Sequence, residues 1–433
     1  MSISRRKALV ALTATGLTAA AGAASSTGSA TRSSSTGSGS APCPDPIYEK
    51  PAAISEAEFG SRRIEGIHAA EVNDFSPFGY SGPFTPSPPH ADLNPRKAIL
   101  IRWKDHNQRF VFSHEASYTP WLELDGHAGL CNQFFESNHG AELFNQNGRN
   151  QRNSFVDIVE SGPQRVWVRW NYICVHENDN EKPALRGTED YVAYPNGLVW
   201  RRLTYETLRP DVPDGYSFQP LDFFCIASPK LGWDDLFSRD TEHGDYLVGS
   251  VIDAYSDRVY RKFWDDKGKS RRVGDARLLL EISKSKGLAM VAPFKVGSAF
   301  VILGESSGFP ASRTQVVDHS FKDTGGWGWG AIRWDHWPVG WINSQAHDRE
   351  PGSIYPYHFG QFSHYIVDQP IIDAKLDFLK TLQNMDLNRW TERHVYYTLT
   401  GVARDDASVR KIARRWLDKG KECANPASVA DLI

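Results

Sequence analysis

Short segments of alternating apolar and polar residues recur between residues 60 and 400. They are rich in β-branched and aromatic side chains and are bounded by Gly, Pro, Asn or Asp, which is the pattern of β-strands. Many follow a period of two, and this favours antiparallel sheets with one solvated face. The predicted strands are KAILIRW, QRFVFSHE, NSFVDIVES, RVWVRWNYICVHE, EDYVAYPNGLVWRRLTYETL, YLVGSVIDAYS, ARLLLEISKSKGLAMVAPF, SAFVILGE and HVYYTLTGVA.

Helical patterns are few. SEAEFGSRR near Ser55 and DAKLDFLKTLQNM each predict a short helix, and DDASVRKIARRWLDKGKECA predicts a longer one near 405–424. An Asn-Gly pair at Asn196–Gly197 lies between two predicted strands and indicates a tight hairpin. No internal repeat of roughly 30–50 residues is found, which argues against a propeller. We therefore predict a mainly β fold, a large antiparallel β-sandwich of the supersandwich kind with a few peripheral helices, in one catalytic domain over 43–433.

The first 42 residues have the pattern of an export segment. SRRKALVAL, from Ser4 to Leu12, places two arginines before an Ala-rich apolar run, and a Ser/Thr/Gly-rich spacer follows. This resembles a bacterial twin-arginine export signal. Ala8 stands where that motif usually has an aromatic residue, so an ordinary secretory signal stays open. We expect a secreted protein, extracellular or periplasmic, without stable membrane insertion, because the apolar run is short for a span.

Charge and cysteine content narrow the function classes. The net charge is −3 with no strongly basic half, so nucleic acid is not expected as a partner. Aromatic residues reach 12%, and many are Trp and Tyr, which combine a flat apolar face with a polar group. The chain has five cysteines and no C-x-x-C motif. A disulfide between Cys43 and Cys423 and a set of buried thiols both remain open.

Motifs for several well-known chemistries are absent or incomplete. Gly304–Gly308 matches G-x-S-x-G, but the residues that follow do not predict the helix that a nucleophile elbow requires, so an esterase with Ser306 as nucleophile ranks last. The sequence contains no H-E-x-x-H, EF-hand or Walker motif. We expect no required cofactor. A metal site is unknown from sequence, and a structural Ca²⁺ or Zn²⁺ ion stays open.

Two segments combine aromatic rings with amides, arginines and histidines. The first covers 120–162, and the second is DTGGWGWGAIRWDHWPVGWINSQAHD, from Asp323 to Asp348. Fork-shaped donors suit hydroxyls and carboxylates, and flat rings suit sugars, so both segments indicate a carbohydrate site. The alternatives are an amide-rich loop and a tryptophan-rich core. The predicted substrate-binding residues are Asn132, Arg149, Arg152, Asn153, Trp327, Trp329, Arg333, Trp334, Trp337, Tyr357 and His358.

These two segments, together with GTEDYVAYPNGLVWRRLTYE, resemble secreted bacterial carbohydrate-active proteins on large β-sandwiches, among them polysaccharide lyases and galactose-mutarotase-like folds. For a lyase, the resemblance implies β-elimination beside a uronate, with the carboxylate neutralised by Asn, His or Arg and with His or Tyr as base and acid. Asn132, His127 and Arg152 are the candidates for the carboxylate. The candidate catalytic residues are His127, Tyr191, His336 and His347.

The sequence leaves two other functions open, a glycoside hydrolase and a non-catalytic carbohydrate-binding protein. A glycoside hydrolase would need two carboxylates at a suitable separation, which sequence cannot measure. A non-catalytic carbohydrate-binding protein would need the aromatic platform but no acid–base pair. We predict that the partner is an acidic polysaccharide, because arginines could make the groove positive. These arginines are Arg149, Arg152, Arg186, Arg201, Arg202 and Arg333.

Overall fold

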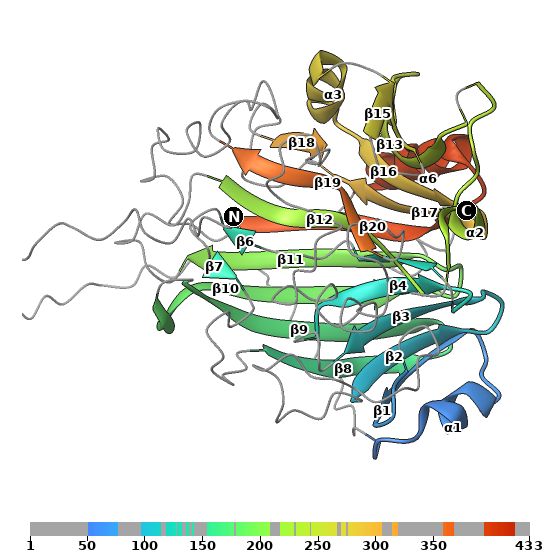
Figure 1. The fold of residues 1–433 in the computed structure, drawn as a ribbon. Coiled ribbons are helices and arrows are strands. Elements are labelled where there is room, and N and C mark those ends of the chain that lie inside the picture. The colour runs from blue at the N-terminus through green and yellow to red at the C-terminus, as the bar shows by residue number, and fades with distance from the viewer. Residues whose placement is uncertain are drawn as a thin grey trace, which may run out of the picture. The chain divides into compact units, whose positions relative to one another are not determined.

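Two antiparallel sheets face each other in the computed structural model of this chain (Figure 1). The chain divides into two units, Met1–Asp45 and Pro46–Ile433, and every element below belongs to the second. The predicted boundary between 42 and 43 lies outside the described residues and stays a prediction. The structure describes residues 51–76, 97–113, 118–126, 128–131, 136–137, 141–142, 154–176, 179–207, 217–228, 231–242, 244–265, 270–273, 276–304, 314–318, 358–367 and 394–420.

The first sheet has its strands in the order β1–β2–β3–β4–β5–β12–β19–β18, all antiparallel to their neighbours. Apolar residues of its inner face, such as Phe110 and Phe112, are fully buried. The bounds are β1 (Ile67–Val72), β2 (Ala98–Trp103), β3 (Gln108–Ser113), β4 (Pro120–Leu124), β5 (Ala128–Cys131), β12 (Ser217–Ala227), β19 (His358–Val367) and β18 (Thr314–Asp318).

The second sheet has the order β8–β9–β10–β11–β20–β17–β16–β13–β14–β15, again antiparallel. A small ladder, β6 (Glu136–Ser137) and β7 (Ala141–Glu142), connects β12 to β9 and so joins the two sheets. The bounds are β8 (Ser154–Gly162), β9 (Arg165–His176), β10 (Asp179–Ala193), β11 (Val199–Thr207), β20 (His394–Ala403), β17 (Gly297–Leu303), β16 (Leu288–Phe294), β13 (Tyr246–Asp253), β14 (Val259–Trp264) and β15 (Ser270–Val273).

The Asn-Gly hairpin is confirmed between β10 and β11. Tyr194 N–H donates to Leu198 O at 2.9 Å, and Gly197 N–H donates to Tyr194 O at 3.0 Å. Gly197 has φ of 85°, a left-handed conformation that glycine adopts without a steric penalty. This turn fixes the register in which Tyr191 pairs with Arg201, two residues that meet again in the candidate site.

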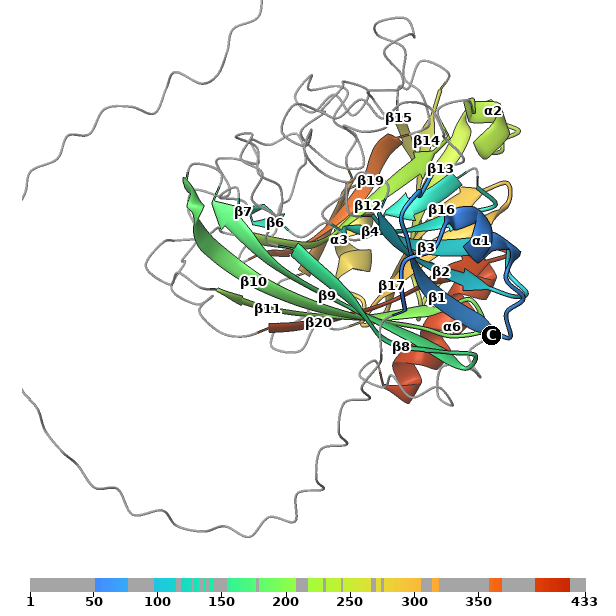
Figure 2. The same ribbon diagram turned by 90° about the horizontal axis from the view of Figure 1, so that it is seen from below.

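Helix α6 (Asp406–Lys419) lies where the sequence predicts a helix near 405–424. Asp405 caps its N-terminus by accepting from Ser408 N–H at 2.8 Å. The helix ends before Gly420, whose φ is 96°. Its buried residues belong to the same apolar cluster as residues of β11, β17 and β20, so α6 covers the outer face of the second sheet there (Figure 2).

The other helices differ in part from the prediction. Helix α1 (Glu56–Ser61) confirms the helix near Ser55, and α2 (Trp233–Leu236) was not predicted. The strand predicted for ARLLLEISKSKGLAMVAPF is wrong in its first half, which forms α3 (Ala276–Ser283), and confirmed in its second half, which forms β16. Leu279 and Ile282, three residues apart, are buried apolar side chains of this helix, a spacing that fits one helical face.

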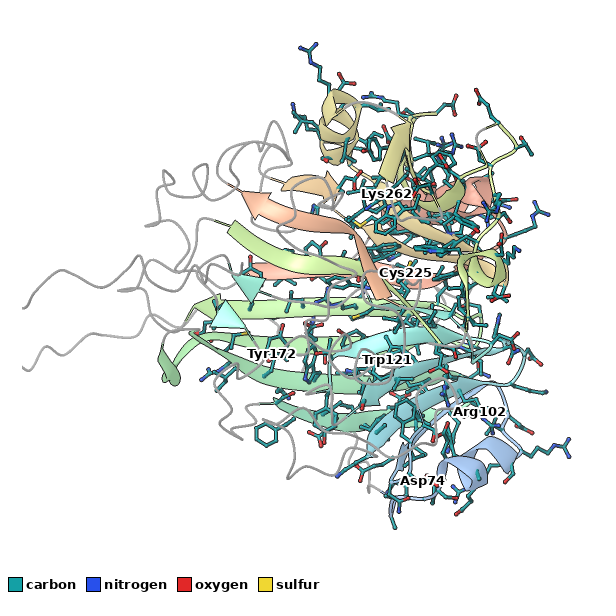
Figure 3. All side chains as sticks on the ribbon, in the orientation of Figure 1. Asp74, Arg102, Trp121, Tyr172, Cys225 and Lys262 are labelled. Atoms are coloured by element: carbon teal, nitrogen blue, oxygen red, sulfur yellow. The ribbon has the colours of Figure 1, made fainter. Side chains whose placement is uncertain are left out.

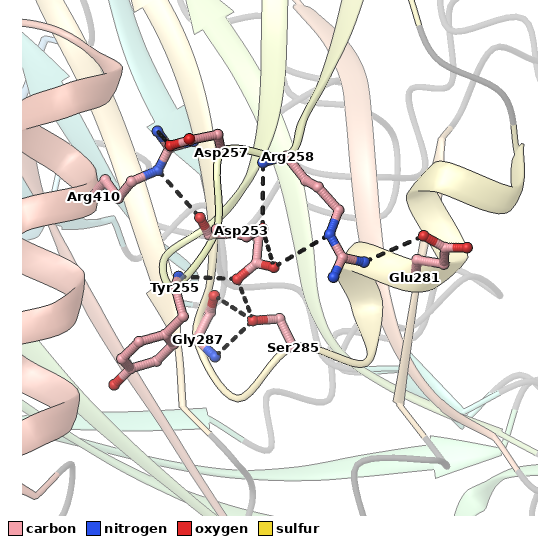
Figure 4. Close-up of polar contacts among 9 residues, drawn as sticks. Asp253, Tyr255, Asp257, Arg258, Glu281, Ser285, Gly287 and Arg410 are labelled. Atoms are coloured by element: carbon pink, nitrogen blue, oxygen red, sulfur yellow. Dashed lines mark hydrogen bonds and ion pairs between the residues drawn. The ribbon is translucent and has the colours of Figure 1, made fainter.

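Asp253, at the end of β13, forms hydrogen bonds with the loop that follows β13, with the turn after α3 and with α6 (Figure 4). Its carboxylate accepts from the hydroxyls of Ser256 and Ser285, each at 2.6 Å, and from Tyr255 N–H at 3.0 Å. Arg410 of α6 donates to the Asp253 backbone oxygen at 3.2 Å. Burial alone would raise the pKa of Asp253, but these hydrogen bonds and nearby Arg258 outweigh burial and lower the pKa below its ordinary value.

Replacing Asp253 with Asn should lower the free energy of unfolding by about 1–3 kcal/mol near neutral pH, because buried donors lose a charged acceptor. The folded pKa lies below the unfolded value of about 3.9, so this contribution is present above that value and disappears as the pH falls through the folded pKa. The stability difference between wild type and variant, measured by urea denaturation, should therefore shrink on acidification. Asp257→Asn, at an exposed carboxylate, is the control and should change little. A difference independent of pH would contradict this assignment.

Candidate functional site

The inner face of the second sheet carries an unusual concentration of polar and aromatic side chains. Strand register places Tyr191 opposite Arg201, and Arg201 opposite Thr398 of β20. The neighbouring row runs from Trp170 through Glu189 and Leu203 to Tyr396. Tyr191 contacts Phe110 and Phe112 of β3, with ring centroids 5.7 and 5.1 Å apart. These side chains therefore lie between the two sheets.

A buried ion pair forms the centre of this face. Arg201 donates to both Glu189 oxygens, from Nε at 2.6 Å and from Nη2 at 2.9 Å. The hydroxyl of Tyr172 donates to the same carboxylate at 2.8 Å, and the hydroxyl of Tyr191 donates to it as well. We call Tyr172, Glu189, Tyr191 and Arg201 the Glu189 cluster. The Arg201 and Glu189 side chains are only 1% and 0% exposed. The two opposite charges therefore balance each other inside the protein, with almost no contact with water.

Burial and charge set the protonation states in the Glu189 cluster. Burial raises the pKa of Tyr172 and Tyr191 well above the ordinary tyrosine value, and the negative charge of Glu189 raises each pKa further. Burial alone would lower the pKa of Arg201, but the Glu189 carboxylate outweighs it and raises that pKa. Both tyrosines therefore stay protonated and act as donors, and Arg201 stays charged at any pH at which the protein is folded.

A glycine positions Tyr172. Gly187 of β10 lies directly opposite Tyr172 of β9, and a Cβ atom at Gly187 would lie 2.2 Å from Tyr172 Cζ. The tyrosine ring therefore crosses over the glycine, a close approach that another residue would block. Trp170 holds the ring from the neighbouring row, with a centroid distance of 4.3 Å (Tyr172 is labelled in Figure 3).

A histidine–tyrosine pair connects the two sheets beside the cluster. His364 Nδ1 on β19 lies 2.8 Å from the Tyr396 hydroxyl on β20. The Arg201 guanidinium lies 5.9 Å from the centre of the Tyr396 ring, and its Nη1 donates to Pro220 O on β12 at 3.1 Å. The His364 and Tyr396 residues are 3% and 0% exposed. Water therefore has almost no access to this pair.

Burial lowers the pKa of His364 to about 3 and raises the pKa of Tyr396, although Arg201 opposes the increase. Near neutral pH both groups are uncharged. A neutral imidazole can take a proton, and a protonated phenol can give one. The pair thus places a neutral imidazole, a weak base at this low pKa, in hydrogen-bond contact with a protonated phenol where water is excluded.

Two further buried ion pairs support the framework. Lys262 Nζ of β14 lies 3.0 Å from Asp318 of β18, and the Tyr260 hydroxyl donates to the same carboxylate at 2.7 Å. Glu123 of β4 accepts from Arg109 of β3 at 2.8 Å. Burial raises the pKa of Glu123, while Arg109 opposes the increase. Lys262, labelled in Figure 3, lies among β13–β16 and far along the sheet from Tyr172.

Most of the site residues predicted from sequence lie outside the described residues. Among the described ones, Tyr191 belongs to the Glu189 cluster, and His358 is the first residue of β19, paired with Ile226 of β12. The roles of both stay predictions. Arg201 and Arg202, both predicted to make the groove positive, are consecutive on β11 and therefore lie on opposite faces of the sheet. The remaining predicted catalytic and substrate-binding residues lie outside the described ranges: His127, Asn132, Arg149, Arg152, Asn153, Trp327, Trp329, Arg333, Trp334, His336, Trp337, His347 and Tyr357.

Sequence reasoning missed His364 entirely, and it placed Tyr396 only within a predicted strand. A usable signal exists, since HFGQFSHYIV places histidine and aromatic residues in a β-type segment. Tyr191 and Tyr194 lie on opposite faces of the second sheet, because Tyr191 contacts Phe112 of the first sheet and Tyr194 belongs to the apolar cluster under α6.

Within the described ranges, no group of three or more His, Cys, Asp or Glu side chains is arranged to hold a metal ion. None of the helices that the structure describes is long and apolar enough to span a membrane. Cys131, Cys174 and Cys225 are buried thiols, and Cys43 and Cys423 lie outside the described residues.

Glu189→Gln should lower the free energy of unfolding by about 3–5 kcal/mol, because the Arg201 charge would remain buried without its counterion. The double variant Glu189→Gln with Arg201→Met should recover part of that loss, since it removes the uncompensated charge. Urea denaturation of the two variants and of wild type measures both effects. A double variant less stable than Glu189→Gln alone would show that the ion pair is not the dominant interaction of the cluster.

No protein-family model matches the sequence, and no curated protein matches it. Among solved structures, the chain is similar to galactose 1-epimerase from Lactobacillus acidophilus NCFM. The identity is 10%, the match covers 71% of this chain and 95% of that one, and the TM-score is 0.31. Similarity at this level assigns no family and no function.

Proposed function

We propose that this protein is a carbohydrate-active enzyme that cleaves a uronate-containing polysaccharide by β-elimination. The observation that carries the proposal is the uncharged His364–Tyr396 pair, a base and an acid 2.8 Å apart between the two sheets. A core built only for stability gains little from burying these two polar groups, since a net hydrogen bond contributes only about 0.5–1.5 kcal/mol. The secreted character and the acidic substrate are sequence-based predictions that complete this proposal.

In the proposed reaction, His364 removes the proton beside the uronate carboxylate. The carbon–oxygen bond to the leaving sugar breaks, Tyr396 protonates the departing oxygen, and a carbon–carbon double bond forms without consumption of water. The proton then returns from the imidazolium to the phenolate through their own hydrogen bond. A bound carboxylate near His364 would raise the low pKa of the imidazole and so make it a stronger base.

The Glu189 cluster has a positioning role in this proposal. Arg201 cannot also neutralise a substrate carboxylate, because its guanidinium already binds Glu189 and Pro220 O. Neutralisation would then fall to the sequence-predicted Asn132, His127 or Arg152. Because His364 and Tyr396 are buried, a substrate must displace the side chains that cover them.

Hydrolysis by a carboxylate pair has less support among the described residues. Glu189 and Asp190 are consecutive on β10, so their side chains point to opposite faces of the sheet and cannot flank one glycosidic bond. Glu123 is committed to Arg109. Asp125, an exposed residue after β4, accepts a hydrogen bond from the Asn107 side-chain amide, and Asp335 lies outside the described residues.

The purified protein should release unsaturated products from at least one uronate polymer, seen as ultraviolet absorbance that rises together with reducing ends. Tyr396→Phe and His364→Gln should each lower kcat by about 10²–10⁴-fold, the usual contribution of general acid–base catalysis. Reducing ends without absorbance would indicate hydrolysis and overturn the proposal.

Tyr260→Phe is the matched control for Tyr396→Phe. Tyr260 is also a buried tyrosine with a hydrogen-bonded hydroxyl, but its partner is Asp318. Both variants should lose similar thermal stability, and only Tyr396→Phe should lose turnover. Equal loss of activity in the two variants would mean that Tyr396 acts through stability alone.

A further inference from the structure

The outer face of the second sheet, over β8–β11, presents a second polar and aromatic surface. Register aligns Asp157, Arg169, Asp190 and Arg202 in one row across the four strands. The adjacent row contains Phe155, Asn171 and Thr188. This surface points away from the first sheet, and α6 covers only the neighbouring part of the same face (Figure 2).

Positive charge is exposed at the centre of this surface, while the balancing carboxylate is hidden. Asp190 accepts from Arg169 Nε at 2.8 Å, from Trp167 Nε1 at 2.9 Å and from Arg202 Nη2 at 2.5 Å. The Asp190 side chain is 2% exposed, whereas those of Arg169 and Arg202 are 33% and 41% exposed. A ligand that approaches β9–β11 therefore meets two guanidinium groups. The exposed Asp157 on β8 limits the positive region on that side.

Flat rings and neutral hydrogen-bonding groups surround the guanidinium groups. The Arg169 guanidinium lies 5.0 Å from the centre of the Trp167 ring. Phe155 is 66% exposed, more than any other large apolar side chain in the described ranges. The Thr188 hydroxyl donates to the Asn171 side-chain oxygen at 3.0 Å. Sugar rings and hydroxyls fit such surroundings, and the guanidinium groups suit carboxylates.

We propose that this outer surface, formed by Phe155, Trp167, Arg169, Asn171, Thr188 and Arg202, is a non-catalytic binding site for a carboxylate-bearing polysaccharide. It takes the substrate class of the proposed function but lies on the opposite face of the sheet from His364–Tyr396, so each site can be disabled without the other. Nucleic acid is the less favoured ligand, because the arginines of this face each pair with a carboxylate, Arg186 with Glu206 at 3.5 Å among them, and the chain carries a net charge of −3.

The test measures retention of the protein in native gels that contain polygalacturonate, alginate or hyaluronan. Wild type should be retarded by at least one of these polymers, and much less by fully methyl-esterified polygalacturonate, which lacks the carboxylates. Arg202→Gln should weaken binding roughly tenfold, since a charged hydrogen bond is lost, and Phe155→Ala should also weaken it. Arg202→Lys should keep part of the affinity, because it retains the charge.

Two variants serve as matched controls. Arg258→Gln removes an arginine with 47% exposure that also pairs with a carboxylate, and Val296→Ala removes an apolar side chain with 49% exposure. Both should bind as wild type does. Binding to none of the three polymers, or equal binding by Arg202→Gln and Arg258→Gln, would overturn the proposal. Tighter, Arg202-dependent binding to single-stranded DNA would assign the surface to nucleic acid instead.

Turnover separates this site from the proposed catalytic one. Arg202→Gln and Phe155→Ala should retain wild-type kcat on short oligosaccharides, whereas His364→Gln should bind polymer normally and lose turnover. If Arg202→Gln lost turnover on short oligosaccharides in proportion to its loss of binding, the surface would not be a separate site. If His364→Gln retained turnover, only the proposed catalytic role would fail.

Discussion

The arrangement of side chains on the inner face of the second sheet depends on one buried negative charge, which must be balanced. A carboxylate as deeply buried as that of Glu189 is unfavourable unless its oxygens are fully hydrogen-bonded and its charge is paired. Arg201, Tyr172 and Tyr191 meet that need from three neighbouring strands. Arg201 also donates to Pro220 O of β12. The guanidinium that balances Glu189 therefore also links the second sheet to the first.

This arrangement explains why polar chemistry can exist inside a β-sandwich. The guanidinium beside Tyr396 opposes the rise in the pKa of that phenol, and the phenol in turn holds His364 by a hydrogen bond. On the other face of β10, Asp190 is equally well hidden, but its arginine partners remain partly exposed. Glu189 and Asp190 are consecutive on β10, so each balances arginine charge on a different face of the sheet. The face of Glu189 is closed to water, and the face of Asp190 is partly open to it.

Local sequence patterns were sufficient for much of the fold. The β-sandwich, the turn at Asn196–Gly197 and α6 follow from periodicity and turn chemistry. The pattern failed at α3, because a short apolar run does not distinguish a strand from a buried helix. It also could not identify the His364–Tyr396 pair, since β19 and β20 come together only through the packing of the two sheets. The predicted tryptophans, and the predicted histidines other than His358, lie outside the described residues.

The position of β20 has a consequence for the order in which the protein can fold. This strand, at His394–Ala403, pairs with β11 on one side and β17 on the other. Its partners precede it by almost 200 and 100 residues, and contacts this distant in sequence form slowly. A nascent chain that has not reached residue 394 cannot close the second sheet, and until then β11 and β17 each have an unpaired edge. Such edges invite association with other chains, so synthesis is the period of greatest risk of aggregation.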